Sequence, residues 1–204
     1  MLAEVDPSPP TECSAEDALR ASIYRLFARL LTAAPSTETL VDTSRLAGDD
    51  ATAFGAAINA LATAAAQADA PTVETEFHDL FTGVGRGELV PYASYYLTGF
   101  LHERPLAQLR GEMARLGIQR NPDVKEPEDN IASILEVMAG LIDGTFAGGL
   151  SIGEQRTFFE THIASWAPHL FDDLAGAQSS DFYRSVAHAA SEFIAIEREG
   201  FRMS

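Results

Sequence analysis

Apolar residues recur along this chain at the three- and four-residue spacing of an α-helix, and no segment alternates as a β-strand does. Leu19, Ile23 and Leu26 belong to the first such stripe, which Pro35 ends. Comparable stripes follow, up to a last one over residues 180–199. The sequence therefore predicts an all-α fold, a single-domain helical bundle of about eight or nine helical segments.

Two helix starts are marked by capping residues. Ser151 with Glu154 matches the capping box, in which a hydroxyl and a carboxyl group satisfy N–H groups at the start of a helix. Ser14 with Asp17 resembles it, although Asp is shorter than the usual Glu or Gln. We therefore expect helices to begin directly after Ser14 and Ser151.

The start of the chain differs in composition from the rest. Residues 1–13 are rich in Pro, Ser and Glu, so we expect a mobile tail there and one helical domain over residues 14–204. The sole cysteine, Cys13, excludes an intramolecular disulfide and suits a reducing compartment. The tail lacks the features of a secretory signal, and no stretch approaches the roughly 20 apolar residues of a membrane span. We expect a soluble, cytoplasmic protein.

The charge of the chain restricts its partners. Thirty acidic residues against fourteen basic ones give a formal net charge of −16 at pH 7. Nucleic acids and anionic membranes bind basic surfaces, so the sequence argues against both as partners. A basic peptide or protein segment would be attracted by the negative electrostatic field of this chain. In the simpler interpretation, the acidic residues only keep the protein soluble.

Patterns typical of catalytic and metal sites do not occur in the sequence. The five histidines fall in no metal-binding spacing, and Cys13 lies in the tail. Gly83, Gly85 and Gly87 follow a predicted helix and precede no Lys-Ser/Thr pair, which favours a loop of unusual backbone angles over a phosphate site. We predict no catalytic residue, no metal and no cofactor.

One segment concentrates tyrosines. Pro91, Tyr92, Tyr95 and Tyr96 occur within residues 90–97, and three tyrosines at this spacing cannot share one buried helical stripe. Some of them must line a groove or another irregular surface, where tyrosine offers apolar area with a polar tip. In the alternative interpretation they cover the core around an irregular loop.

A second segment concentrates carboxylates. It consists of Glu126, Pro127, Glu128, Asp129 and Asn130. We expect this segment to open the next helix, with its acidic residues in the first turn. Three carboxylates in four residues could bind an arginine guanidinium through charge-assisted hydrogen bonds. In the simpler interpretation, these carboxylates only complement the dipole of that helix.

These segments also carry a family resemblance. Residues 126–132 resemble the E-P-x-D-H motif of the TorD/DmsD/NarJ family of molybdoenzyme-maturation, twin-arginine leader-binding chaperones. Residues 77–83 and then 91–97 are similar to that family's F-x-x-L-F-x-G and P-x-x-S-x-Y elements, and residues 155–166 resemble its F-x-x-H-[LI]-x-x-W element. The three matches occur in order, within a chain that is predicted to be all-helical and is acidic.

The resemblance implies a TorD/DmsD-like bundle and a non-enzymatic, cytoplasmic chaperone for a molybdenum-cofactor oxidoreductase. The implied partner is the precursor's twin-arginine signal peptide, its immature apo-form, or both, so that cofactor loading is aided and export held back. The implied client-binding residues are Pro91, Tyr92, Tyr95, Tyr96, Glu126, Pro127, Glu128, Asp129 and Asn130. The carboxylates would hold the two arginines, and the groove with the tyrosines would bury the apolar part of the leader.

Several alternatives stay open at this stage. Asn130 stands where the family has His, so an imidazole contact is not expected here. His162 and Trp166 are interpreted as packing residues. Two other functions stay open. The chain could act as a NarJ-like assembly factor that binds the mature apo-enzyme without a leader, or as a small helical enzyme that uses carboxylates. The client enzyme stays open, and the resemblance allows both a monomer and a domain-swapped dimer.

Overall fold

The computed structural model describes residues 14–83, 87–119 and 125–204, so the predicted mobile tail and Cys13 lie outside the described residues. In these ranges the secondary structure is helical, apart from one isolated β-bridge, and the all-α prediction is confirmed. The elements are α1 (Ala15–Thr32), α2 (Thr37–Ser44), α3 (Ala53–Gln67), α4 (Ala70–Phe77), the π-helical turn η1 (His78–Thr82), α5 (Ala93–Thr98), α6 (Arg104–Arg115), α7 (Ile131–Asp143), α8 (Ile152–Phe159), the π-helical turn η2 (Glu160–Ala164), α9 (Ala167–Gly176) and α10 (Phe182–Met203).

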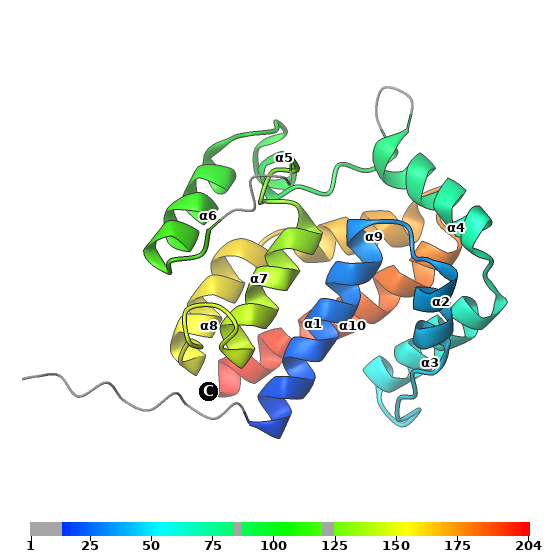
Figure 1. Ribbon diagram of the computed structural model, residues 1–204, viewed down its shortest axis with the longest axis horizontal. Helices are drawn as coiled ribbons and strands as arrows, with labels where there is room; N and C mark the ends of the chain where they lie inside the picture. The colour runs from blue at the N-terminus through cyan, green and yellow to red at the C-terminus, as the bar shows by residue number, and fades with distance from the viewer. Residues whose placement is uncertain (1–13, 84–86, 120–124) are drawn as a thin grey trace, which may run out of the picture.

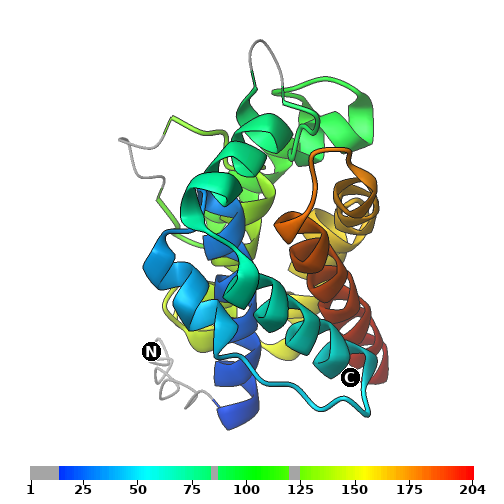
Figure 2. The ribbon, with the colours of Figure 1, turned by 90° about the vertical axis from the view of Figure 1, so that its right-hand side faces the viewer.

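The helices pack around a central pair. α1 and α7 lie side by side, and α10 packs behind them and contacts α3 and α9 (Figure 1). Seen from the side of α2, α3 and α4, these three helices lie in front and α10 runs beside them (Figure 2). Helices α5 and α6 occupy the opposite side, next to the start of α7. None of the helices in the described ranges is long and apolar enough to cross a membrane.

The core is centred on α7. Ten of its thirteen residues are buried, because neighbouring helices cover it on almost every side. α1 and α10 instead bury one face each, as their apolar stripes predict. The large aromatic side chains of Trp166, Tyr24 and Tyr183 are fully buried, and His162 is 5% exposed. The interpretation of His162 and Trp166 as packing residues therefore fits the burial of both.

The two helix starts follow the predicted cap residues Ser14 and Ser151. Ser14 Oγ accepts a hydrogen bond from Asp17 N at 3.0 Å, and Asp17 Oδ2 accepts one from Ser14 Oγ at 2.9 Å. Ser151 and Glu154 form the reciprocal pair at the start of α8. These caps are local, so the sequence shows them directly.

The predicted start of the helix after residue 125 is wrong. α7 begins at Ile131, and Asn130 is its N-cap, with Asn130 Oδ1 accepting from Ala132 N at 2.9 Å. Asn130 N donates to Pro127 O at 3.2 Å, so residues 127–130 form a turn in front of the helix. The first turn of α7 therefore contains no acidic residue, and the three carboxylates lie in the preceding loop. Asn is a favoured N-cap residue, which is why the helix begins where it does.

Glu76 supplies a cap to a distant helix. It lies on α4 and is 8% exposed. Its carboxylate accepts hydrogen bonds from the backbone N–H groups of Asp181, Phe182 and Tyr183, at 2.8, 3.1 and 2.7 Å. These are the otherwise unsatisfied donors at the start of α10, so one buried carboxylate both caps α10 and ties it to α4.

Glu88 holds the loop between α9 and α10 in a similar way. Its carboxylate accepts from Gln178 N at 2.6 Å and Ser179 N at 3.1 Å. These two backbone donors lower the pKa of the Glu88 carboxyl. The preceding Gly87 packs so close to η1 that a Cβ atom there would lie 2.6 Å from Leu80 O, which explains the glycine at this position.

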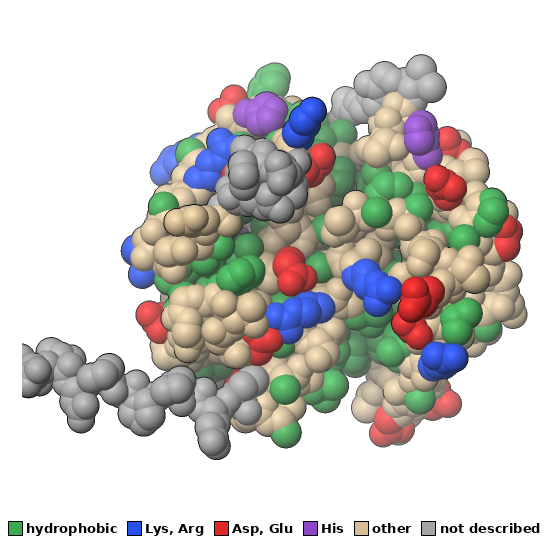
Figure 3. Space-filling model, in the orientation of Figure 1, with side chains coloured by type: hydrophobic (Ala, Val, Ile, Leu, Met, Phe, Trp, Pro, Cys, Tyr) green, Lys and Arg blue, Asp and Glu red, His purple; other side chains and the backbone are tan. Residues whose placement is uncertain are grey.

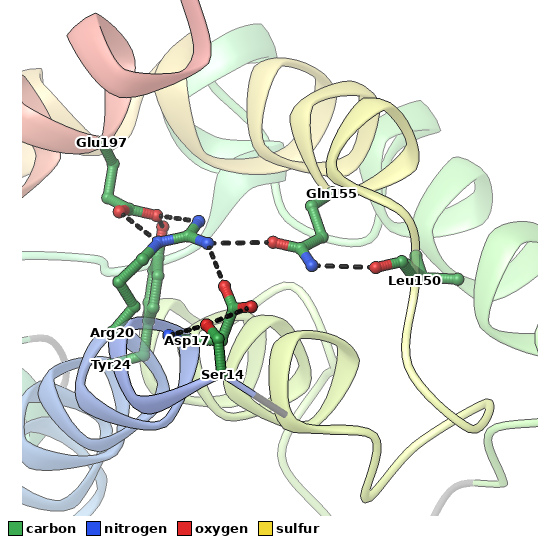
Figure 4. A network of polar contacts seen from close by, with 7 residues as sticks. All are labelled: Ser14, Asp17, Arg20, Tyr24, Leu150, Gln155 and Glu197. Carbon is green, nitrogen blue, oxygen red and sulfur yellow. Dashed lines mark hydrogen bonds and ion pairs between the residues drawn. The ribbon is translucent and has the colours of Figure 1, made fainter. Parts of the chain in front are cut away.

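A buried polar network joins the first and last helices (Figure 4). Arg20 Nε and Nη2 donate to the two carboxylate oxygens of Glu197, both at 2.8 Å, and Tyr24 Oη donates to Glu197 Oε2 at 3.0 Å. Arg20 Nη1 donates to Asp17 at 2.9 Å and to Gln155 at 3.2 Å. One guanidinium thus connects α1, α8 and α10, and both charges of the central ion pair are hydrogen-bonded on several sides.

Replacing Glu76 by Ala is expected to destabilise the protein by about 3 kcal/mol, because three backbone donors at the start of α10 lose a charged acceptor in a buried place. Glu76→Gln keeps one acceptor oxygen and is expected to cost about half as much. Urea unfolding of both variants measures this difference. Equal stability of Glu76→Ala and the wild type would show that α10 does not need this cap.

Glu88→Gln is expected to destabilise the protein at neutral pH by roughly 0.5 kcal/mol, a small effect because the carboxylate is exposed to solvent. A carboxyl group with a lowered pKa stabilises the fold above its ordinary pKa of 4.5, and this stabilisation is lost as the pH falls through its lower folded value. The difference in free energy of unfolding between variant and wild type should therefore shrink as the pH falls below 4.5 and through the lower pKa of the folded state. Urea unfolding across the acid range tests this, and a constant difference would contradict it.

Candidate functional site

The two segments singled out in the sequence lie against each other. Tyr92 and Asn130 form an isolated antiparallel bridge. Ala93 N donates to Asp129 O at 2.9 Å, and Ile131 N donates to Pro91 O at 2.9 Å. The loop before α5 and the loop before α7 are therefore joined through their backbones, and the tyrosine-rich and carboxylate-rich segments lie together in one candidate site.

Asp129 is committed to this junction. It is 1% exposed, and its Oδ2 atom accepts from Ser94 N at 2.9 Å. Ser94 lies in the first turn of α5, so Asp129 caps that helix from another part of the chain. Its carboxylate is thus buried and turned toward the fold, unlike a group that meets a partner in solvent.

Glu128 is also bound within the chain. Its Oε2 atom lies 2.8 Å from Arg110 Nη2 and 2.9 Å from Arg110 Nε, and the Glu128 side chain is 10% exposed. Arg110 comes from α6, which packs beside α5. Glu128 therefore binds a guanidinium of the same chain, and its predicted contact with an arginine of a client stays a prediction.

Glu126 is the exposed carboxylate of the segment. It lies on the boundary between two cavities, which share Thr32, Ala132 and Ser133 as further lining residues. The smaller cavity, about 200 Å³, lies between the end of α1, η1 and the tyrosine loop. The larger one, about 460 Å³, lies between α1, α7 and the end of α6.

The walls of both cavities are mainly apolar. Phe77, Phe81, Pro91 and Tyr92 line the smaller one. Met113, Ile118, Val137 and Phe146 line the larger one. Glu126, Glu128 and Glu136 add carboxylates to the larger cavity. Arg29 also lines the larger cavity and donates to Thr39 Oγ1 at 2.9 Å, so one cationic side chain stands beside three carboxylates. Apolar walls with an excess of carboxylates suit a ligand that is apolar along its length and cationic at one end.

The tyrosines divide between this surface and the core. Tyr92 lines the smaller cavity. Tyr96 packs on Trp166 with ring centroids 5.5 Å apart and donates to Asp173 Oδ2 at 2.9 Å. Burial and this hydrogen bond raise the pKa of the Tyr96 hydroxyl. Tyr95 is half-buried with its ring edge-on to Tyr96. Tyr92 thus fits the groove interpretation, whereas Tyr96 fits the core-covering alternative.

Sequence reasoning missed several residues that form the site. Arg110, Met113 and Ile118 reach it from α6 and the loop that follows, and Phe77 and Phe81 reach it from α4 and η1. The F-x-x-L-F-x-G element contains both phenylalanines, but its spacing does not show which cavity they face. No pattern in the sequence shows that α6 lies over the carboxylate segment.

No group of three or more His, Cys, Asp or Glu side chains in the described ranges is arranged to hold a metal ion. The carboxylates of the candidate site are instead separated by function: Asp129 caps α5, Glu128 pairs with Arg110, and Glu126 faces solvent.

Comparison with known proteins agrees with this fold. A family model described as nitrate reductase delta subunit matches residues 47–172. The chain is 28% identical over 135 residues to the chaperone protein TorD of Vibrio atlanticus, covering 62% of this chain and 63% of that protein. It is 29% identical over 126 residues to the chaperone protein TorD of Vibrio cholerae, covering 58% and 57%. The match thus spans less than two thirds of the length of these relatives.

A solved structure from Archaeoglobus fulgidus, provisionally described as a redox enzyme maturation protein, has the same fold. It aligns with a TM-score of 0.58 and 19% identity over 87% of this chain and 94% of that chain. The family resemblance that the three sequence elements indicated is therefore confirmed.

Asp129→Ala is expected to lower the free energy of unfolding by about 2 kcal/mol, because Ser94 N–H loses its buried charged acceptor. Amide hydrogen exchange at Ser94 should accelerate together with the loss of stability. Asn130→Ser, which keeps a capping oxygen at the neighbouring position, is the control and should stay within about 0.5 kcal/mol of the wild type. Unchanged exchange at Ser94 in Asp129→Ala would contradict the capping role.

Proposed function

We propose that this chain, which belongs to the nitrate reductase delta subunit family, is a cytoplasmic chaperone that binds a molybdenum-cofactor oxidoreductase before its maturation is complete. The ligand at the candidate site is the client's twin-arginine signal peptide. The chaperone binds and releases this segment without a chemical step, so the site contains no catalytic residue. Its role is to aid cofactor loading and to delay export of the unfinished enzyme.

The observation that carries this proposal is the position of Glu126. Its exposed carboxylate lies between two cavities with apolar walls, at the junction of the two family motifs. A twin-arginine leader has two adjacent guanidinium groups followed by an apolar stretch. The guanidinium groups suit charge-assisted hydrogen bonds to Glu126. The apolar stretch suits burial in the cavities, where each Å² of buried apolar surface contributes roughly 25 cal/mol of binding free energy before the cost of ordering the peptide.

The charge of the whole chain supports the same ligand. A formal net charge of −16 attracts a cationic segment over distances longer than direct contact, which raises the association rate at low salt. Once bound, the leader is unavailable to the export machinery. Release then depends on the client burying or withdrawing the segment when its cofactor is in place.

A second candidate partner is the body of the same enzyme. The matching family model is described by a subunit of nitrate reductase, whereas the curated relatives are TorD chaperones. A NarJ-like assembly factor would bind the apo-enzyme without a leader. Affinity capture of the tagged chain from its native cytoplasm, with intact and with leader-deleted client, separates the two: loss of capture on deletion supports leader binding, and retained capture supports body binding.

Glu126→Gln is expected to weaken binding of a synthetic twin-arginine peptide roughly tenfold at low salt, because it removes the exposed carboxylate without changing side-chain size. Glu16→Gln is the matched control. It makes the same charge change on an exposed residue at the opposite end of α1, roughly 20 Å away along the helix. Titration calorimetry measures both affinities.

The control variant should stay within about twofold of the wild type, since a lost long-range charge changes affinity little at moderate salt. If both variants bound the peptide equally more weakly than the wild type, the loss of affinity would come from the change in net charge and not from a contact with Glu126. Unchanged affinity in Glu126→Gln would remove Glu126 from the binding site.

A further inference from the structure

Two of the three carboxylates that line the larger cavity lie beside cations of the same chain. Glu128 Oε2 lies 2.8 Å from Arg110 Nη2, and Glu136 Oε1 lies 3.6 Å from Arg25 Nε. Acidic and basic side chains accordingly lie next to each other over α1 and α7 on the face that Figure 3 shows. Glu126 is the carboxylate of this cavity that has no cationic partner among the residues that the structure describes.

Arg29 adds a positive charge to the same cavity. It lies on α1 and is exposed, and its Nη2 atom donates to Thr39 Oγ1 at 2.9 Å. Thr39 is buried on α2, so this bond positions the guanidinium without neutralising its charge. Within the described part of the chain Arg29 has no acidic partner, and four of its five N–H groups make no hydrogen bond there.

We propose that Arg29 binds a carboxylate of the client's signal peptide and so selects leaders that carry an acidic residue close to the arginine pair. The inference rests on the proposed leader binding and adds to it a residue that sets peptide specificity. Glu126 binds one arginine of the pair, and Arg29 binds the carboxylate through charge-assisted hydrogen bonds. A peptide with charges of both signs therefore fits this cavity better than a peptide that is only cationic.

The geometry of α1 indicates the spacing of the two contacts. Thr32 and Glu126 line both cavities, whereas Arg29 lines the larger one and not the smaller one. Arg29 precedes Thr32 by three positions, so it lies one turn, roughly 5–6 Å, from the boundary between the cavities. In an extended peptide, side chains two positions apart point to the same side and lie roughly 7 Å apart. We therefore expect the acidic residue two positions from the arginine that binds Glu126.

Long-range electrostatics alone predicts the opposite preference. A formal net charge of −16 repels an acidic side chain, so an added carboxylate should weaken the binding of a cationic peptide to this chain. A carboxylate that contacts Arg29 instead gains charge-assisted hydrogen bonds, which depend on its exact position in the peptide. An acidic residue at that position should therefore strengthen binding, and an acidic residue far from it should not.

The test measures the affinity of the full chain for synthetic peptides with two adjacent arginines and an apolar stretch, by titration calorimetry at low salt. In each peptide one residue is either Glu or Gln. It stands at one of the four positions that lie two residues from either arginine, or at the far end of the apolar stretch. At one of the four positions, Glu should give roughly threefold tighter binding than Gln, the modest gain of an exposed ion pair. At the far end, Glu should give no gain.

Arg104→Gln is the matched control for Arg29→Gln. Arg104 is exposed at the start of α6, lines neither cavity, and has no acidic partner among the residues described. Both substitutions remove one positive charge, so the preference for Glu should disappear in Arg29→Gln and persist in Arg104→Gln. If Arg29 only braces α1 against Thr39, its substitution changes stability and leaves the ratio of the two peptide affinities as it is in the wild type.

A readout on the wild type covers the case in which Arg29→Gln does not fold. The side-chain Nε–H resonance of Arg29 should shift more on saturation with the favoured Glu peptide than with its Gln counterpart.

Three results would overturn the inference. They are the absence of a preference for Glu at all four positions, a preference that survives in Arg29→Gln, and equal loss of the preference in Arg29→Gln and Arg104→Gln. Equal shifts of the Arg29 resonance with both peptides would contradict it as well. If none of the peptides binds the wild type at low salt, the proposed leader binding itself is wrong, and this inference with it.

Discussion

Backbone N–H groups at the start of a helix need acceptors, and this fold obtains several of them from carboxylates elsewhere in the chain. Glu76 on α4 serves the start of α10, and Asp129 before α7 serves the start of α5. Glu88 does the same for the loop that leads from α9 to α10. Each contact also fixes how two elements lie relative to each other. Part of the large negative charge is therefore structural, in addition to any effect on solubility or on partners.

This explains which parts of the fold the sequence predicts. The spacing of apolar residues predicts helices because the residues of one stripe lie only three or four positions apart in the chain. Capping boxes can be predicted from the sequence for the same reason, because their two residues are also close in the chain. Asp129 and Ser94 are 35 positions apart, and Glu76 and Asp181 are 105 apart, so no local pattern links them. The start of α7 was misplaced for a related reason: Asn130 is the cap, and the acidic residues before it belong to other contacts.

The candidate site shows the same limit. The two family motifs predict that residues 91–96 and 126–130 act together, and the structure joins them through backbone hydrogen bonds. The motifs do not show which of their residues join the two loops and which line the cavities. Asp129 and Asn130 build the junction, Tyr96 packs against the core, and Glu126 and Tyr92 line the smaller cavity. Asn130 in place of the family's His is compatible with the fold because its amide oxygen caps α7.

The ion pair between Arg20 and Glu197 has a consequence for the order of folding. The two residues are 177 positions apart, so their contact closes almost the whole chain into one loop. Closing so long a loop costs more chain entropy than any local contact, and it is repaid only when the surrounding helices are already close. The guanidinium of the first helix therefore stays without its main partner until the last helix docks. A chain that has not yet docked α10 can already pack α1 against α7, but it leaves the rings of Tyr24 and Phe27 without their contact to Phe193.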